Sequence, residues 1–215
     1  TNAIPELCTL LRRPRAVMML VPAGDPVDAV IASLTPHLDE GDLIIDSGNS
    51  HFTDTDRRAD QLAKEGLLFM GMGMSGGASG ARHGPSLMPG GPRRGYERIE
   101  RILQAAAAQA SSGACVAYLG PGSAGHYVKM VHNGIEYALM QLIAETYDLM
   151  KRGLGLAPDK LQRVYERWRQ GALDSYLMEI TADIFKLRDE RTDGFLIDKI
   201  LDQAKQKGTG QWSAA

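Results

Sequence analysis

The sequence has little cysteine, no marked excess of charge of either sign and no long apolar run. Its 215 residues include two cysteines, Cys8 and Cys115, which form neither a disulfide framework nor a metal cluster and favour a reducing, cytoplasmic setting. With 24 basic and 26 acidic residues the net charge is −2, so we expect no nucleic-acid or anionic-membrane partner. No run approaches the roughly 20 apolar residues of a membrane-spanning helix, and no secretory leader is visible.

The composition is that of a globular protein, with 44% hydrophobic and 23% charged residues. The first residue is Thr1, and the sequence closes on KGTGQWSAA just after a glycine-rich turn. We therefore expect an internal segment of a longer protein. The alternative is a processed mature chain.

Short apolar runs alternate with helix-length segments in the first half of the chain, which predicts a parallel, doubly wound sheet. The predicted strands are 16–21, 43–46, 67–70 and 115–119, and the predicted helices between them are 26–38, 54–65 and 93–110. After Gly122 only helical patterns follow, at 124–152, 159–170, 175–188 and 195–205. The predicted fold class is α/β, with a partial Rossmann-like domain over 1–122 and an all-helical domain over 123–215.

The longest helical pattern carries a stripe of polar side chains. Five residues lie at offsets of 0, 3, 4, 7 and 8: Lys129, His132, Asn133, Glu136 and Tyr137. At about 100° per residue they share one side of the helix, and the other sides are mostly apolar. A helix that is apolar on most sides is usually buried, so we expect the stripe to line a cleft. An ordinary solvated face is the alternative, although such faces are usually rich in Glu and Lys.

The stripe contains the groups needed for acid–base chemistry. A desolvated lysine such as Lys129 can act as a base, and a buried carboxyl such as Glu136 can donate a proton. Asn133 can orient a substrate hydroxyl, and Tyr137 and His132 can hydrogen-bond an anionic group.

A glycine-rich stretch over 71–91 includes the spacing G-x-G-x-x-G. We do not interpret it as a dinucleotide fingerprint, because that motif opens a helix at once and here further glycines and two prolines follow. We expect a loop whose backbone N–H groups, with the Ser75 hydroxyl, approach an anion. A flexible linker is the alternative.

Two further features are weaker. Lys207 and Thr209 flank a glycine in K-G-T-G and suit phosphate binding, but glycine after a basic turn is also a common helix stop. Asn49 follows the second predicted strand, where ligands bind in open parallel sheets. A plain turn is the alternative there.

Taken together, these segments resemble the 6-phosphogluconate dehydrogenase family. Five matching segments occur in family order: MLVPAG (19–24), IIDSGNSHF (44–52), GMSGGASGARHGPSLMPGG (73–91), VKMVHNGIEY (128–137) and LDQAKQKGTGQW (201–212).

The resemblance implies oxidative decarboxylation of 6-phosphogluconate with NADP, no metal, and a homodimer in the full-length protein. It implies that Lys129 is the general base and that Glu136 is the acid that protonates the enediol carbon. The implied substrate-binding residues are Asn49, Ser75, Gly76, Gly77, His132, Asn133, Tyr137, Lys207 and Thr209. The implied cofactor-binding residues are Val21, Pro22, Ala23 and Asn49.

Some positions depart from the family pattern, and other functions stay open. Pro22 stands where many members have Lys and Ser47 where they have Gly, which leaves NAD as an alternative to NADP. Ala78–Ser79 replaces an acidic pair. The alternatives in function are a related β-hydroxyacid dehydrogenase and a non-catalytic module that keeps the fold. We expect the isolated 215-residue chain to be inactive, because the pyrophosphate loop of the family would precede Thr1.

Overall fold

The computed structural model describes residues 1, 3–201, 203 and 212. The chain divides into two compact units. One comprises residues 1–134 and 208–215, and the other comprises residues 135–207. The division falls inside a single long helix, α6 (Ala124–Asp148).

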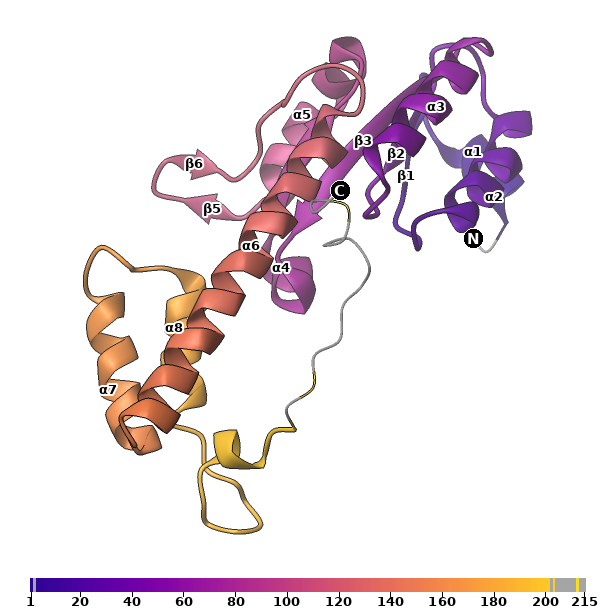
Figure 1. Ribbon diagram of the computed structural model, residues 1–215. Coiled ribbons are helices and arrows are strands. Elements are labelled where there is room, and N and C mark those ends of the chain that lie inside the picture. The colour runs from indigo at the N-terminus through magenta and orange to yellow at the C-terminus, as the bar shows by residue number, and fades with distance from the viewer. Residues whose placement is uncertain (2, 202, 204–211, 213–215) are drawn as a thin grey trace. The chain divides into compact units, whose positions relative to one another are not determined.

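A four-stranded sheet organises the first unit (Figure 1). Its strands lie in the order β1 (Ala16–Met19), β2 (Leu43–Asp46), β3 (Leu68–Ser75) and β4 (Ser86–Gly90). The pairs β1–β2 and β2–β3 are parallel, and β3–β4 is antiparallel. The α/β, Rossmann-like prediction is therefore confirmed, with one antiparallel strand in an otherwise parallel sheet.

Helices cover both faces of this sheet, because its central strands are apolar on both sides. Leu43, Met70 and Met72 pack on one face against α5 (Arg93–Ala106). Ile44 and Phe69 pack on the other face. The helices that bury this second face are α1 (Ile4–Leu10), α2 (Asp25–Leu34) and α3 (Phe52–Ala63).

The second unit is helical. The C-terminal part of α6 continues into a π-helical turn, η2 (Leu149–Gly153), and packs with α7 (Pro158–Arg169) and α8 (Tyr176–Ile184) (Figure 1). Tyr165 is fully buried at the centre of this cluster. Among the described residues of 195–205, the only helical element is the 3-10 turn η3 (Leu196–Lys199). The helix predicted there is therefore wrong for these residues.

Two predictions in the first unit are also wrong. The glycine-rich stretch is not a loop, because β3 runs through it to Ser75 and is followed by α4 (Gly77–His83) and β4. The expected strand over 115–119 is reduced to a single bridge between Leu87 and Val116. The only regular pairing nearby, among the described residues, is a short hairpin of β5 (Gln109–Ala110) and β6 (Gly113–Ala114).

Glycines bring the start of α6 into direct contact with β3. A Cβ atom added at Gly73 would lie 2.5 Å from Lys129 Cβ, and one added at Gly71 would lie 2.7 Å from His126 Nδ1. From the helix side, a Cβ atom at Gly125 would collide with the carbonyl oxygens of Gly71 and Met88. Gly71 and Gly73 lie on one face of β3, and each therefore packs against one of two successive turns of α6.

The expectation that α6 is buried by its apolar sides is wrong for the described residues. Val131, Ile135 and Leu142 are 38%, 59% and 58% exposed, whereas Lys129 and Asn133 are each only 8% exposed. The helix docks through its polar and small residues instead. None of the described helices is long and apolar enough to cross a membrane.

The contact at Gly125 leads to a prediction about stability. Gly125→Ala should lower the free energy of unfolding by about 3 kcal/mol, because the new methyl group meets backbone atoms that cannot move aside. Gly153→Ala is the matched control, since a Cβ atom there meets nothing within 4 Å. Urea unfolding measures both. Equal stability of the two variants would contradict the close contact.

Candidate functional site

Two turns meet at the carboxyl ends of β1 and β2. A Cβ atom added at Gly48 would lie 2.8 Å from the carbonyl oxygen of Val21, so the turn after β2 is in contact with the turn after β1. Val21 of the predicted cofactor segment thereby lies against Gly48, the residue that precedes Asn49. In open parallel sheets this edge is where dinucleotides and substrates bind.

A buried carboxylate anchors the second of these turns. Asp46 is fully buried, accepts a hydrogen bond from the Ser50 hydroxyl at 2.5 Å and accepts another from the Gly48 backbone N–H at 3.0 Å. The Ser50 bond spans the turn that carries Asn49, and the Gly48 bond holds the residue before it. The position of Asn49 is therefore fixed by the last residue of β2.

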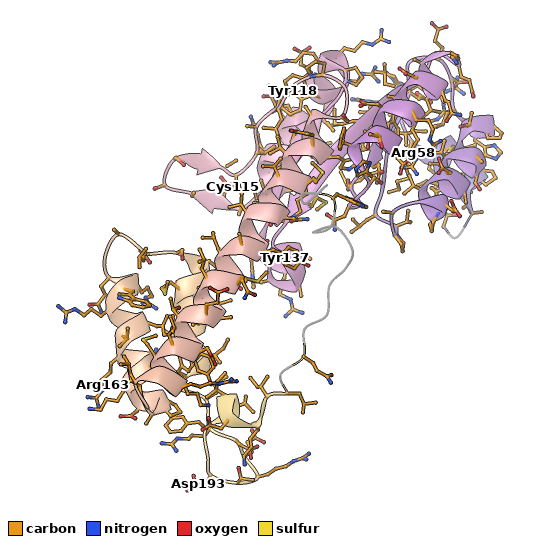
Figure 2. All side chains as sticks on the ribbon, viewed as in Figure 1. Arg58, Cys115, Tyr118, Tyr137, Arg163 and Asp193 are labelled. Carbon is orange, nitrogen blue, oxygen red and sulfur yellow. The ribbon has the colours of Figure 1, made fainter. Side chains whose placement is uncertain are left out.

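Arg58 of α3, labelled in Figure 2, supplies a positive charge next to Asp46. It is 1% exposed, and its guanidinium lies 3.8 Å from Asp46 and 2.8 Å from Asp28. It also donates to the Gly24 carbonyl at 3.1 Å, and this bond anchors the end of the turn after β1. The hydrogen bond from Arg58 is the main reason that the pKa of Asp28 falls from 3.8 to about 2.

A small pocket lies beside Asn49 and contains the proposed base. Its lining residues come from the turn after β2, from α6 and from the C-terminal segment: Asn49, Ser50, His126, Lys129, Met130, Asn133 and Trp212. Lys129 packs its aliphatic stem on Gly73, as the close approach of their carbons indicates. The structure thus places Asn49, Lys129 and Asn133 around one pocket.

The other residues of the polar stripe are less enclosed. His132 is half-buried and its Nδ1 lies 3.3 Å from the Asn133 side-chain oxygen. Glu136 is half-buried, and Tyr137, labelled in Figure 2, is 38% exposed. The stripe therefore runs from buried residues at its start to exposed residues two turns later.

Ser75 lies at the end of β3, two residues beyond Gly73 and so on the same face of the strand. Gly76 and Gly77 follow with φ values of 138° and 55°, which favour glycine. Ser75 is thus the last residue of β3, on the face where Lys129 packs, and Gly77 begins α4. Lys207 and Thr209 lie outside the described residues.

Sequence reasoning missed several residues of this site. They are Arg58, His126, Met130 and Trp212. Trp212 lies near His51, with ring centroids 4.9 Å apart. The available signal for His126 was its spacing of three residues from Lys129, which places both on one side of a helix.

The described residues contain no group of three or more His, Cys, Asp and Glu that could hold a metal ion. The polar groups of the pocket are instead amide, hydroxyl, imidazole and amine. Such groups suit hydrogen bonding and proton transfer to an organic ligand.

Two family models match nearly the whole chain. Residues 1–120 match the NAD binding domain of 6-phosphogluconate dehydrogenase, and residues 125–215 match the 6-phosphogluconate dehydrogenase C-terminal domain. The chain belongs to the 6-phosphogluconate dehydrogenase family. The resemblance expected from the five sequence segments is confirmed.

Curated relatives in this family are similar over the full length of the chain. The decarboxylating 6-phosphogluconate dehydrogenase of Cunninghamella elegans is 56% identical over 215 residues, which are 99% of this chain and 44% of the relative. An NADP(+)-dependent, decarboxylating 6-phosphogluconate dehydrogenase of Bacillus subtilis is 51% identical, over 100% of this chain and 46% of the relative. The chain thus spans less than half the length of these relatives.

Solved structures agree with the fold. A Plasmodium falciparum 6-phosphogluconate dehydrogenase, studied with its cofactor NADP+ and with its substrate 6-phosphogluconate, superposes with a TM-score of 0.95 at 45% identity, over 99% of this chain and 45% of that chain. A 3-hydroxyisobutyrate dehydrogenase of Mycobacterium tuberculosis gives a TM-score of 0.67 at 21% identity, over 82% of this chain and 56% of that chain. The second likeness concerns the fold alone.

The buried charge network leads to a prediction about stability. Arg58→Met should lower the free energy of unfolding by about 3–5 kcal/mol, because it leaves Asp46 buried without its cation. Arg57→Met is the matched control: Arg57 also pairs with Asp28 but is 45% exposed, so its loss should change stability by less than about 1 kcal/mol. Chemical denaturation of both variants measures the difference. Similar losses would contradict the buried role.

The lowered pKa of Asp28 predicts a pH dependence. The unfolded carboxyl titrates near 3.8 and the folded one near 2, so this contribution to stability is complete above about pH 4 and declines as pH falls toward 2. In Arg58→Met the pKa of Asp28 should return toward 3.8, and that part of the decline should shrink. Unfolding curves at several pH values between 5 and 2 test this. An unchanged pH dependence in the variant would contradict the pairing.

Proposed function

We propose that this chain carries the base, the acid and most of the substrate contacts of an enzyme that oxidatively decarboxylates 6-phospho-D-gluconate. The products are ribulose 5-phosphate and CO2, with reduction of NADP, in the oxidative pentose phosphate pathway. The observation that carries the proposal is the buried Lys129 beside Asn49 and Asn133 in one pocket. The names of the relatives support the substrate and the reaction.

The turns at the carboxyl ends of β1 and β2 fit one end of a dinucleotide. They are in contact at Val21 and Gly48, and a Cβ atom added at Gly24 would meet nothing within 4 Å, so the first turn presents backbone to open space. Val21, Pro22, Ala23 and Asn49 would hold the nicotinamide end there. NADP, when bound, would accept the hydride from carbon 3 of the substrate. NAD is the alternative cofactor.

Lys129 would begin the reaction as a general base. Its Nζ would take the proton of the carbon-3 hydroxyl as the hydride leaves the same carbon, which gives a β-keto acid. The ammonium formed in this step then lies next to the new carbonyl and polarises it. The packing of the lysine stem against Gly73 supports this role, because it fixes where the amine can reach.

Loss of CO2 leaves an electron pair that an enediol accommodates. Glu136, two helical turns after Lys129 on α6, would protonate the enediol carbon to give the ketose phosphate. The carbonyl takes up the electron pair, and the ammonium that polarises it does what a metal ion would otherwise do, so the proposed mechanism needs no metal. At the end of the reaction Lys129 is an ammonium and Glu136 is a carboxylate. Proton exchange with solvent would return Lys129 to the neutral amine and Glu136 to the acid.

The remaining proposed contacts bind three different chemical groups of the substrate. Ser75, Gly76 and Gly77 would bind the carboxylate with a hydroxyl and backbone N–H groups. His132 and Asn133 would bind the sugar hydroxyls. Tyr137, Lys207 and Thr209 would bind the phosphate. A homodimer of the complete protein is part of the same proposal.

A related β-hydroxyacid dehydrogenase is the second candidate. The shared fold with 3-hydroxyisobutyrate dehydrogenase keeps it open. Glu136 and Tyr137 favour the first candidate, because a non-phosphorylated acid that is only oxidised needs neither an acid for an enediol nor a phosphate contact.

A substitution tests the base. In the complete gene product, Lys129→Met should abolish turnover of 6-phosphogluconate, since no other group would accept the hydroxyl proton, and substrate binding should stay measurable by equilibrium dialysis. Lys64→Met, which removes an exposed lysine of the same unit, is the control and should keep normal turnover. Assays with NADP and with NAD also give the cofactor preference. Near-normal rates in Lys129→Met would remove the proposed base.

A further inference from the structure

The chain returns to the first unit at its C-terminal end. Residues 208–215 belong to that unit, although residues 135–207 before them form the other one. The structure describes Trp212 of this segment, and its side chain is half-buried. It lines the pocket together with Asn49 and Lys129. The proposed mechanism gives this indole no role, so its contacts require another explanation.

An aromatic contact joins Trp212 to the turn after β2. The indole and the imidazole of His51 have ring centroids 4.9 Å apart and an interplanar angle of 75°, so they meet edge to face. Aromatic pairs prefer this geometry, because the positive edge of one ring then lies on the negative face of the other. His51 directly follows Ser50, whose hydroxyl donates a hydrogen bond to Asp46. Trp212 therefore contacts a segment whose own position is fixed by a buried carboxylate.

The contact continues as a row of aromatic rings. The ring centroid of His51 lies 4.7 Å from that of Phe52, and Phe52 lies 5.3 Å from Tyr127 at an interplanar angle of 89°. Phe52 is the first residue of α3, and Tyr127 lies near the start of α6. The row thus joins the C-terminal segment to the beginnings of two helices beside the pocket. Aromatic side chains bury a large area with few rotatable bonds, so they are suited to anchor a short segment.

Trp212 follows Thr209, a phosphate contact in the proposed function, by three residues. A chain spans at most about 3.6 Å per residue, so the Cα atom of Thr209 can lie no farther than about 11 Å from that of Trp212. Thr209 itself lies outside the described residues. Its hydroxyl can meet a phosphate at the site only while the segment is kept beside the pocket. Each substrate molecule would have to order an unanchored segment, which costs binding free energy.

We propose that Trp212 is a positioning residue: its edge-to-face contact with His51 anchors the C-terminal segment at the pocket and thereby places Thr209 for the phosphate of the substrate. The proposal rests on the proposed function, because it takes 6-phosphogluconate as the substrate and Thr209 as one of its contacts. The loss of one aromatic pair corresponds to a roughly 2- to 10-fold change in an equilibrium constant. That change should appear in the binding of a phosphorylated ligand and not in the binding of its phosphate-free form.

Two substitutions in the complete gene product separate the ring from its bulk. Trp212→Leu keeps an apolar side chain but removes the ring, so the Kd of 6-phosphogluconate should rise roughly 2- to 10-fold, with a smaller change in kcat. Trp212→Phe keeps a ring that can meet His51, and it should bind 6-phosphogluconate nearly as the unmodified enzyme does. D-Gluconate, which lacks the phosphate, should show the same Ki in all three proteins. Equal losses for both ligands in Trp212→Leu would overturn the proposal, because Trp212 would then only shape the pocket around Lys129.

A double-mutant cycle tests the partner of Trp212. His51→Leu should weaken 6-phosphogluconate binding as much as Trp212→Leu does, and the double variant should lose no more than either single variant. Additive losses would overturn the pairing. Trp168→Leu is the matched control, because Trp168 meets Tyr165 edge to face in the other unit, with ring centroids 5.2 Å apart. It should lower the melting temperature and leave the binding of both ligands unchanged.

Hydrogen exchange gives a second readout that needs no activity. In the complete, unliganded protein, mass spectrometry should show faster exchange of the backbone amides of 208–212 in Trp212→Leu than in the unmodified protein, whereas Trp212→Phe should exchange like the unmodified protein. Equal exchange in the three proteins would overturn the anchor. Absence of 6-phosphogluconate turnover in the unmodified enzyme would contradict the proposed function instead, and the exchange rates would still report on the anchor.

Discussion

The contact between β3 and the start of α6 is the constraint on which the site depends. Gly71 and Gly73 have no side chains at the two places where His126 and Lys129 lie, and Gly125 lets the helix backbone approach two carbonyl oxygens of the strands. Any larger residue at these positions would place its Cβ atom within 2.7 Å of an atom of the other element, so the helix or the strand would have to move. The position of Lys129 is therefore set by backbone contact, which is stiffer than contact through long side chains.

A buried charge network plays the corresponding part on the other side of the pocket. The turn that carries Asn49 is short and polar, so apolar packing cannot hold it. Asp46 satisfies its hydrogen bonds, and Arg58 offsets the charge of Asp46 while it reaches the turn after β1 at Gly24. Both turns at this edge of the sheet thus depend on one cation, whose own desolvation is offset by Asp28.

Part of this arrangement could be predicted from the sequence. Apolar runs such as LIID identify buried parallel strands, and spacing along a helix places Lys129 and Asn133 on one side of it. The strand through Gly71–Ser75 could not be recognised, because glycines have no side chains to alternate and carry low strand propensity. The role of Arg58 could not be predicted from the sequence either, because its partners Asp28 and Asp46 come from two other elements and only the fold brings them together.

The orientation of α6 shows why periodicity alone cannot assign the buried side of a helix. The apolar residues of α6 outnumber its polar stripe, yet in the first unit it is Lys129 and Asn133 that are buried and Val131 that is exposed. A hydrophobic pattern measures the transfer of side chains from water, but the approach of two backbones is governed by the smallest residues at the contact. In this chain the glycines of β3 select the side of the helix that docks. Lys129 can occupy that side because the first carbons of its stem pack on Gly73. A residue that is both well packed and polar at its tip is suited to proton transfer, and the strand places it there without any apolar match between the two surfaces.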